Sequence, residues 1–327
     1  MLIRFFKNNN PSLFVLLPIF ALVLWLISFI DQPQFTETKT AFLYNIVLKP
    51  LNAVPYLNTI FAFLLIIGEA FLINLIANEN EVITRRTFLP ALLYIVFMSN
   101  NEAMLTVNPS MFANLFILFS LNKLFTSFRK NTAFSNAFDA GFYLSIASFF
   151  YFPSIILFPI LIVGLIIFRT FNWREWSISF IGIITPYCFV LTYYLWANQL
   201  KTFWNNITSY FVLHDTPSFN FSSSFYFMAV VMAIIILLSL STIVRNIRSA
   251  SQKTKKNLIF LYWFFFFSII SFSIAPQLSS PCFSILAIPL SIFTANYFLN
   301  MKKELFGELL FLLFIATILI NDFSKYF

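Results

Sequence analysis

The chain contains little glycine, histidine and cysteine, and each shortage excludes a class of functional site. Only 5 of its 327 residues are glycine. Neither a GxGxxG nor a Walker A motif is present, which excludes the Gly-rich loops that cradle phosphates. One histidine and two cysteines exclude zinc, haem and iron sites built from several His or Cys ligands. We therefore expect neither a cofactor nor a metal.

Charged residues are also scarce, and this shortage decides the class of protein. Only 10% of the residues are charged, whereas 60% are apolar and 20% are aromatic, and the mean hydropathy is +0.86. An ordinary soluble domain has about 25% charged residues, and its interior is too small to hide this much apolar surface. The composition excludes a soluble globular protein and indicates that lipid is the solvent.

The apolar residues are gathered into eleven runs of helical length. A membrane crossing takes about 20 residues, so the short runs 87–98 and 154–168 are expected to begin inside the protein or to extend through polar flanks. We predict an all-α, polytopic membrane helical bundle in which residues 1–327 form a single domain. The predicted spans lie at about residues 12–30, 57–77, 87–98, 110–125, 134–151, 154–168, 177–196, 224–244, 257–274, 282–298 and 307–320.

The basic residues give this bundle an orientation. With the N-terminus in the cytoplasm, all but four of the 20 Lys and Arg residues fall in cytoplasmic turns; the exceptions are Lys39, Lys49, Lys201 and Lys325. This is a strong positive-inside bias. It predicts a multi-pass protein of the inner membrane with a cytoplasmic N-terminus and an extracytoplasmic C-terminus. Orientation accounts for the net charge of +8, so we expect no nucleic-acid partner.

Two extracytoplasmic loops, residues 31–56 and 197–223, are long enough to hold structure of their own. In each loop, apolar residues recur at helical spacing, which predicts a helix lying at the membrane surface. These residues are Leu43, Ile46, Val47, Leu51 and Val54 in the first loop, and Leu200, Phe203, Trp204, Ile207 and Phe211 in the second.

The outer loops also place acidic, basic and amide side chains on one side of the membrane. A carboxylate can deprotonate an attacking hydroxyl, and ammonium groups can hold a phosphate. The alternative interpretation is that any loop in water carries such residues. The candidate catalytic residues are Asp31, Glu37, Glu102 and His214, and the candidate substrate-binding residues are Lys39, Lys201, Asn101 and Asp215.

Glu69 is the one acidic residue near the middle of a predicted span. A carboxylate at that depth is costly, so it is expected to be protonated, paired or turned toward a polar cavity. It is either a proton or substrate site, or a structural group bonded to a neighbouring helix. The adjacent Gly68 is expected to permit a close approach between helices.

The stretch from Asn108 to Trp196 resembles the middle of GT-C membrane glycosyltransferases. It runs from NPSMFANLFILFSLNKLF through the basic turn FRKN and a tight outer hairpin to FNWREWSISFIGIITPYCFVLTYYLW. The resemblance implies a first outer loop with interfacial helices and an acidic catalytic residue near its start, where Asp31 stands. It implies a polyprenyl-phosphate-linked sugar as the substrate.

The chain departs from the GT-C pattern in three ways. It has no adjacent acidic pair after the first span, no outer arginine to bind a lipid phosphate, and very little glycine. It also resembles an uncharacterised family of Bacteroidota inner-membrane proteins, a resemblance that implies no activity.

Three functions follow as hypotheses. The first is a metal-independent enzyme that transfers a sugar from a polyprenyl-phosphate donor at the outer face, with Asp31 as the general base. The second is a transporter or flippase that uses Glu69. The third is a non-catalytic membrane subunit of a cell-envelope assembly, which packs against lipid and membrane-protein partners.

Overall fold

The fold is described here from a computed structural model of the chain. It describes residues 2–8, 10–30, 42–43, 55–100, 104–128, 130, 132–169, 172–211, 223–247, 250–274, 283–301 and 303–323.

Every regular element in these ranges is helical, which confirms the all-α prediction for the described part of the chain. The elements are α1 (Leu2–Phe6), α2 (Leu13–Ile30), α3 (Pro55–Glu79), α4 (Leu89–Met98), α5 (Pro109–Thr126), α6 (Phe134–Phe150), the 3-10 helix η4 (Phe152–Leu157), α7 (Pro159–Phe168), α8 (Trp173–Trp196), α9 (Leu200–Phe211), α10 (Ser223–Asn246), α11 (Gln252–Ile274), α12 (Phe283–Asn300) and α13 (Glu304–Phe323).

Each of the eleven predicted apolar runs overlaps a helix. Run 154–168 is divided between η4 and α7, and Pro159 stands in the first turn of α7. Proline suits this position because the first helical N–H has no partner within its helix. The apolar runs thus predicted the positions of the helices, and Pro159 marks the residue at which α7 begins.

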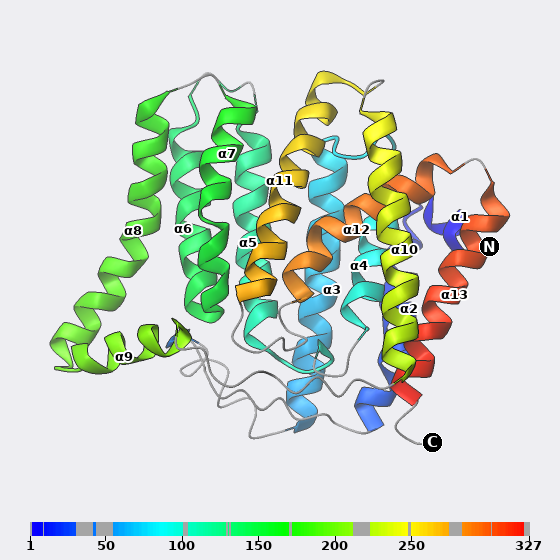
Figure 1. Cartoon of the computed structure of the whole chain (residues 1–327), viewed down its shortest axis with the longest axis horizontal. Helices are drawn as coiled ribbons and strands as arrows, with labels where there is room; N and C mark the ends of the chain where they lie inside the picture. Colours follow the sequence, from blue (N-terminus) through cyan, green and yellow to red (C-terminus); the bar gives the residue numbers. More distant parts are fainter. Residues whose placement is uncertain are drawn as a thin grey trace.

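The helices lie side by side between two opposite ends of the molecule, and α9 lies across one of these ends (Figure 1). The centre is formed by α4 and α12, which pack against each other. All ten residues of α4 are buried, and ten residues of α helix rise only about 15 Å. Of the two expectations for run 87–98, a start inside the protein or an extension through polar flanks, the burial of α4 fits the first. α4 is enclosed by its neighbours, which explains why it is apolar on every side.

The peripheral helices are apolar on their outer surface. Phe189 of α8 is 73% exposed, Leu237 of α10 is 67% exposed and Leu309 of α13 is 66% exposed. Large exposed apolar surfaces of this kind suit contact with lipid. Within the described ranges, six segments are long and apolar enough to cross a membrane: Tyr56–Glu79, Trp173–Trp196, Ser224–Arg245, Gln252–Ser273, Phe283–Asn300 and Glu304–Asp322.

Candidate functional site

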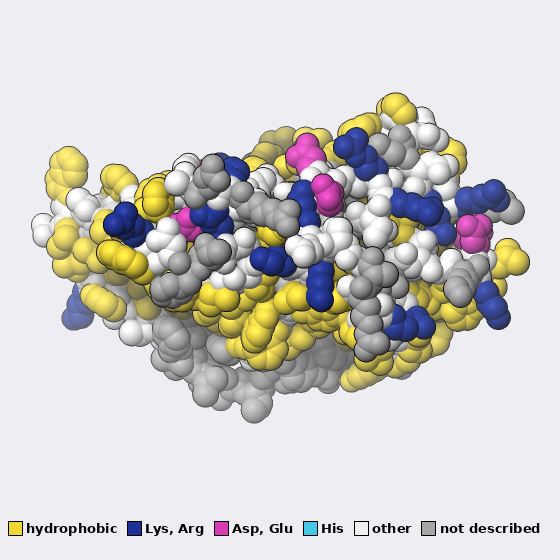
Figure 2. All heavy atoms as spheres, turned by 90° about the horizontal axis from the view of Figure 1, so that it is seen from above, with side chains coloured by type: hydrophobic (Ala, Val, Ile, Leu, Met, Phe, Trp, Pro, Cys, Tyr) yellow, Lys and Arg dark blue, Asp and Glu magenta, His cyan; other side chains and the backbone are white. Residues whose placement is uncertain are grey.

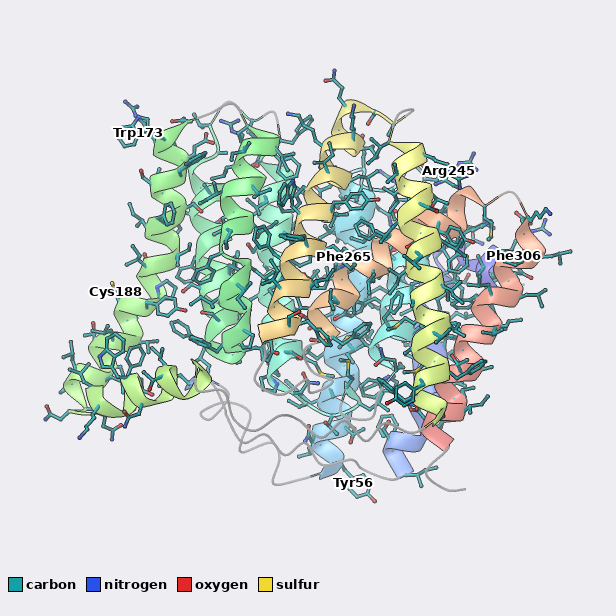
Figure 3. All side chains as sticks on the ribbon, viewed as in Figure 1. Tyr56, Trp173, Cys188, Arg245, Phe265 and Phe306 are labelled. Carbon is teal, nitrogen blue, oxygen red and sulfur yellow. The ribbon has the colours of Figure 1, made fainter. Side chains whose placement is uncertain are left out.

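The two ends of the bundle differ in charge. Seen from above, one end carries many Lys and Arg side chains (Figure 2). Trp173, at the start of α8, and Arg245, near the end of α10, lie at this end, whereas Tyr56, near the start of α3, lies at the other (Figure 3). We call the first the basic end and the second the loop end. The loop end is where the chain enters and leaves the segments that carry the predicted site residues.

Side chains join several helix termini at the loop end. The indole N–H of Trp25, near the end of α2, donates to Ser99 Oγ at 3.1 Å, just after α4. Asn321 of α13 donates to the carbonyl oxygen of Asn100 at 3.5 Å and accepts a hydrogen bond from Ser224 of α10 at 3.3 Å. The termini of α2, α4, α10 and α13 therefore meet in one region.

Phe42, from the segment between α2 and α3, lies at the opposite side of the loop end. The ring of Phe42 lies 5.3 Å from Tyr194 and 5.9 Å from Tyr193, between ring centroids, at the end of α8. Phe203 of α9 packs against Tyr194 from another direction, at 5.1 Å. An aromatic cluster centred on Tyr194 thus joins Phe42 to α9.

The turn from α8 into α9 depends on Asn198. Its φ of 54° is left-handed, a conformation that asparagine tolerates better than most residues. The N–H of Gln199 donates to the carbonyl of Tyr194 at 2.9 Å, and that of Asn198 donates to Leu195 at 3.1 Å. These two bonds form a Schellman motif, which ends a helix and redirects the chain.

The second loop contains a helix, α9, as predicted, whereas its position at a membrane surface stays a prediction. Phe203 is buried against the bundle, Lys201 and Asn205 are exposed, and Trp204 is 59% exposed. In the first loop only residues 42–43 are described, and they are helical. The helix predicted across the rest of that loop lies outside the described residues.

Of the site residues predicted in the two loops and in the turn after α4, Lys201 lies within the described ranges. Lys201 is on the surface of α9. The others follow described positions closely in sequence: Ile30 ends α2, Asn100 follows α4, and Phe211 ends α9. The residues that lie outside the described ranges are Asp31, Glu37, Lys39, Asn101, Glu102, His214 and Asp215.

Glu69 lies in a polar cluster at the centre of the bundle. It is fully buried in α3, and its Oε2 atom accepts a hydrogen bond of 2.6 Å from the hydroxyl of Tyr94 in α4. Asn114 of α5 donates to the Tyr94 oxygen at 3.2 Å and to the carbonyl of Ser284 in α12 at 3.0 Å. Glu69 Oε1 and Asn114 Oδ1 have no hydrogen-bond partner among the described groups. Two buried acceptors in one cluster could take up a proton or a small polar ligand.

The expectation for Gly68 is wrong. A methyl group added there would meet nothing within 4 Å, so Gly68 does not bring α3 close to another helix. The close approach is made instead by Gly141 of α6 and Gly182 of α8. A glycine in a helix permits close packing against a neighbour. The rotation of the helix about its axis decides whether the glycine faces that neighbour.

Three buried polar residues of interest, Tyr94, Asn114 and Asp322, were not predicted from the sequence. Tyr94 and Asn114 complete the Glu69 cluster, and polar side chains within apolar runs were the signal that could have found them. Asp322 of α13 is 1% exposed, and neither of its carboxyl oxygens has a hydrogen-bond partner among the described residues. It follows Asn321, which contacts Asn100 and Ser224 at the loop end.

The described residues contain no group of three or more His, Cys, Asp or Glu side chains that could hold a metal ion.

Comparison with known proteins gives a family without an assigned activity. The model of a family described as "Family of unknown function (DUF6427)" matches residues 1–327. No curated protein and no solved structure matches the chain significantly. On the strength of the family match, this chain belongs to DUF6427, a family of unknown function.

Proposed function

We propose that the chain is an inner-membrane protein that passes from one side of the bilayer to the other eleven times, with the short helix α4 enclosed by its neighbours, its N-terminus in the cytoplasm and its C-terminus outside. Two observations support this topology. Each of the eleven apolar runs overlaps a helix, and Lys and Arg gather at the basic end (Figure 2). The positive-inside rule assigns such an end to the cytoplasm. The loop end, with α9, then faces outward.

For the loop end we propose sugar transfer from a polyprenyl-phosphate donor, on a GT-C-like scaffold. The observation that carries this proposal is the contact of Phe42 with Tyr194. It brings the loop that starts at Asp31 to the corner between α8 and α9. An outer loop that starts with an acidic residue and extends along the membrane surface is what the GT-C resemblance implies.

The proposed reaction needs a base and a phosphate clamp. Asp31 removes the proton of the acceptor hydroxyl, whose oxygen bonds to the sugar as the bond from the sugar to the phosphate oxygen breaks. Polyprenyl phosphate leaves with its charge held by Lys39 or Lys201. Glu37 or Glu102 assists the base, while Asn101, His214 and Asp215 contact the substrates.

The test compares Asp31→Asn with Glu81→Gln in the purified chain, reconstituted with polyprenyl-phosphate sugars and membrane extract as acceptor. General-base catalysis is worth about 10²- to 10⁴-fold, so Asp31→Asn should lower labelled-sugar transfer by at least about 100-fold. Glu81 makes an exposed ion pair with Lys253 at the basic end, and Glu81→Gln should leave transfer unchanged. Full transfer by the Asp31→Asn variant would exclude this mechanism.

A second candidate function, proton-linked transport or flipping, is supported by the Glu69 cluster. The 2.6 Å hydrogen bond from Tyr94 and the unpartnered Glu69 Oε1 place a titratable group with an open acceptor at the core. In proteoliposomes with an imposed proton gradient, Glu69→Gln should abolish proton-linked lipid flipping, and Asp31→Asn should preserve it. Flipping that persists in the Glu69→Gln variant would exclude this function.

A further inference from the structure

The short helix α1 is fastened to the α3–α4 loop at the basic end. Phe6 is fully buried, and its carbonyl oxygen accepts hydrogen bonds from the hydroxyl of Thr87 at 2.8 Å and from the N–H of Phe88 at 3.1 Å. Thr87 is itself held by Asn78 of α3 through two hydrogen bonds, of 3.0 and 3.2 Å. The position of α1 against this loop is therefore fixed by buried contacts.

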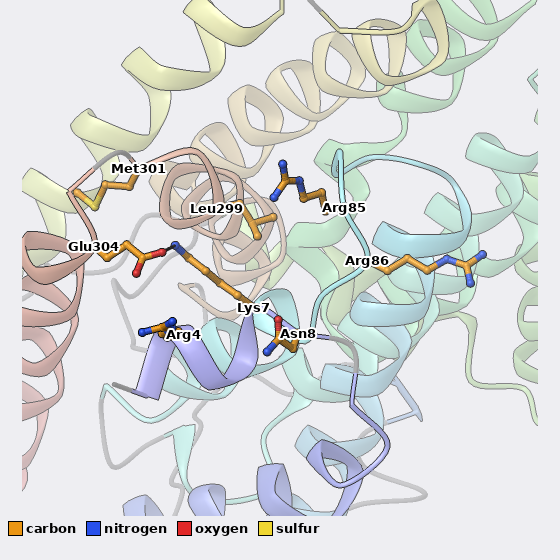
Figure 4. Close-up of a pocket in the computed structure, with 8 residues that line it drawn as sticks. All are labelled: Arg4, Lys7, Asn8, Arg85, Arg86, Leu299, Met301 and Glu304. Carbon is orange, nitrogen blue, oxygen red and sulfur yellow. Dashed lines mark ion pairs between the residues drawn. The ribbon is translucent and has the colours of Figure 1, made fainter.

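This attachment gathers cationic side chains around a cavity of about 560 Å³ (Figure 4). Arg4, Lys7 and Asn8 come from the N-terminal segment, and Arg85 and Arg86 come from the α3–α4 loop. Leu299, Met301 and Glu304, from the end of α12 and the start of α13, complete the lining.

The charges lining the cavity are unbalanced. Four lining residues are cationic, and Glu304 is the single carboxylate among them. Glu304 is paired with Lys7 at 3.6 Å, while Arg86 extends away from this pair (Figure 4). Cations that converge on one cavity repel one another, and a bound anion relieves that repulsion. A positive-inside bias requires basic residues at this end, but it does not require them to share a cavity.

From this arrangement we infer that the cavity binds a phosphate-bearing anion. Arginine matches the geometry of phosphate through paired N–H donors, and lysine adds a point charge. The volume lies within the range of ligand pockets, about 300–1,000 Å³. The site is at the opposite end from the proposed transfer site, so neither inference depends on the other.

The surroundings of the cavity suit the head group of an anionic phospholipid. Phe5 lies next to Arg4 in sequence, Leu305 and Phe306 follow Glu304, and all three are exposed apolar residues. Acyl chains could lie along this surface while the phosphate enters the cavity, as anionic lipids do at basic pockets between membrane helices. A soluble phosphate compound shares the same head-group chemistry, and the experiment separates the two sources.

The test uses the purified full-length chain in detergent, with phosphatidylglycerol, phosphatidylcholine and inorganic pyrophosphate as probes. Native mass spectrometry measures lipid binding, and isothermal titration calorimetry measures pyrophosphate binding. The test variant is Arg4→Gln/Arg85→Gln. The matched control, Arg174→Gln/Lys255→Gln, removes the same charge from exposed positions at the same end.

We expect a preference for a phosphate-bearing anion over phosphatidylcholine. Because each basic residue near a phosphate contributes about fivefold, the test variant should bind about 10- to 30-fold more weakly. The control should bind as the unmodified chain does, and Arg4→Lys/Arg85→Lys should retain most of the affinity. Binding of phosphatidylglycerol alone identifies a lipid head group as the source, and binding of pyrophosphate identifies a soluble phosphate compound.

Two results would overturn the inference: equal weakening by the test and control variants, or equal binding of phosphatidylcholine and the anionic probes. If the double variant does not remain monodisperse, Arg85→Gln alone decides the question, because this side chain is exposed on the α3–α4 loop. Unchanged affinity in that single variant would also count against the site.

Discussion

At the scale of single residues, Asp322 stands out because its carboxyl group is buried without a described hydrogen-bond partner. Burying such a group costs free energy, and a protein tolerates the cost most readily where function requires it. Its neighbour Asn321 contacts Asn100 and Ser224 at the loop end. Asp322 is therefore a candidate member of the proposed transfer site.

We predict that Asp322→Asn stabilises the folded protein but lowers its sugar-transfer activity. Asparagine has the same shape without the charge, so the free energy of unfolding should rise by about 1 kcal/mol. Thermal unfolding in detergent measures this change, and the sugar-transfer assay measures the loss of function. A lower unfolding temperature with unchanged transfer would assign Asp322 a structural role instead.

Arg169 and Glu175 show the opposite case, because their buried charges form a two-point ion pair. Arg169 Nη2 and Nε lie 2.6 and 3.1 Å from the two carboxyl oxygens of Glu175. The exposed fractions of the Arg169 and Glu175 side chains are only 10% and 2%. The pair fixes the turn between α7 and α8 at the basic end.

Glu175→Gln should lower the free energy of unfolding by about 3 kcal/mol, because it removes the carboxylate charge that faces the buried Arg169 guanidinium. Glu81→Gln breaks the more exposed pair with Lys253 and should cost less than about 1 kcal/mol. Chemical denaturation of both variants in mixed micelles gives the comparison. Equal losses in the free energy of unfolding would show that burial does not determine how much each ion pair stabilises the protein.

At the scale of elements, α6 and α8 pack closely through two glycines. A methyl group on Gly141 would collide with the carbonyl oxygen of Ser179, and one on Gly182 with the carbonyl oxygen of Phe138. These are backbone atoms, so no side chain can rotate to make room. The approach positions α8, and through Asn198 it positions α9 at the loop end.

Gly182→Ala should therefore force the two helices apart and cost about 1–3 kcal/mol. Gly68→Ala is the matched control, because the added methyl group meets nothing within 4 Å and alanine favours a helix by about 0.5–1 kcal/mol. The two variants should shift the thermal unfolding temperature in opposite directions. A stabilising Gly182→Ala would contradict the packing described here.

At the scale of the whole molecule, the distribution of charge predicts how the bundle is oriented in the membrane. The basic end gathers Lys and Arg, and Lys201 on α9 is at the loop end. If the basic end is cytoplasmic, the surface of α9 is accessible from outside the cell and the start of α8 is not.

Cysteine labelling tests this orientation. In a Cys188→Ser/Cys282→Ser background, Trp204→Cys should react with a membrane-impermeant maleimide in intact spheroplasts. Arg174→Cys should react only after the membrane is permeabilised, because it lies at the basic end. The reverse pattern would show that the topology is inverted.

Much of the fold could be predicted from the sequence, because helices that lie in lipid must be made largely of apolar residues. Apolar runs located the helices, and the helical spacing of apolar residues located α9. The shortness of run 87–98 left two expectations open, a start inside the protein or an extension through polar flanks, and α4 fits the first. The error at Gly68 has a physical reason. Sequence shows that a small residue is present, but the rotation of the helix decides whether its face meets another backbone.

The candidate site was less predictable for the same reason. Glu69 was recognised by its charge in an apolar run, whereas its partners Tyr94 and Asn114 come from other helices. The convergence of Arg4 and Arg85 also depends on a contact between segments about 80 residues apart, made through Thr87 and Phe6.

Composition and spacing indicate the membrane character, the helical class and the bias of basic charge, because these properties depend only on how many residues of each kind occur and where they stand along the chain. Only the packed structure shows which polar groups share a buried cluster, which glycines lie against the backbone of a neighbouring helix, and which cations surround one cavity. Those relations join residues distant in sequence, and only the packing of whole helices brings them together.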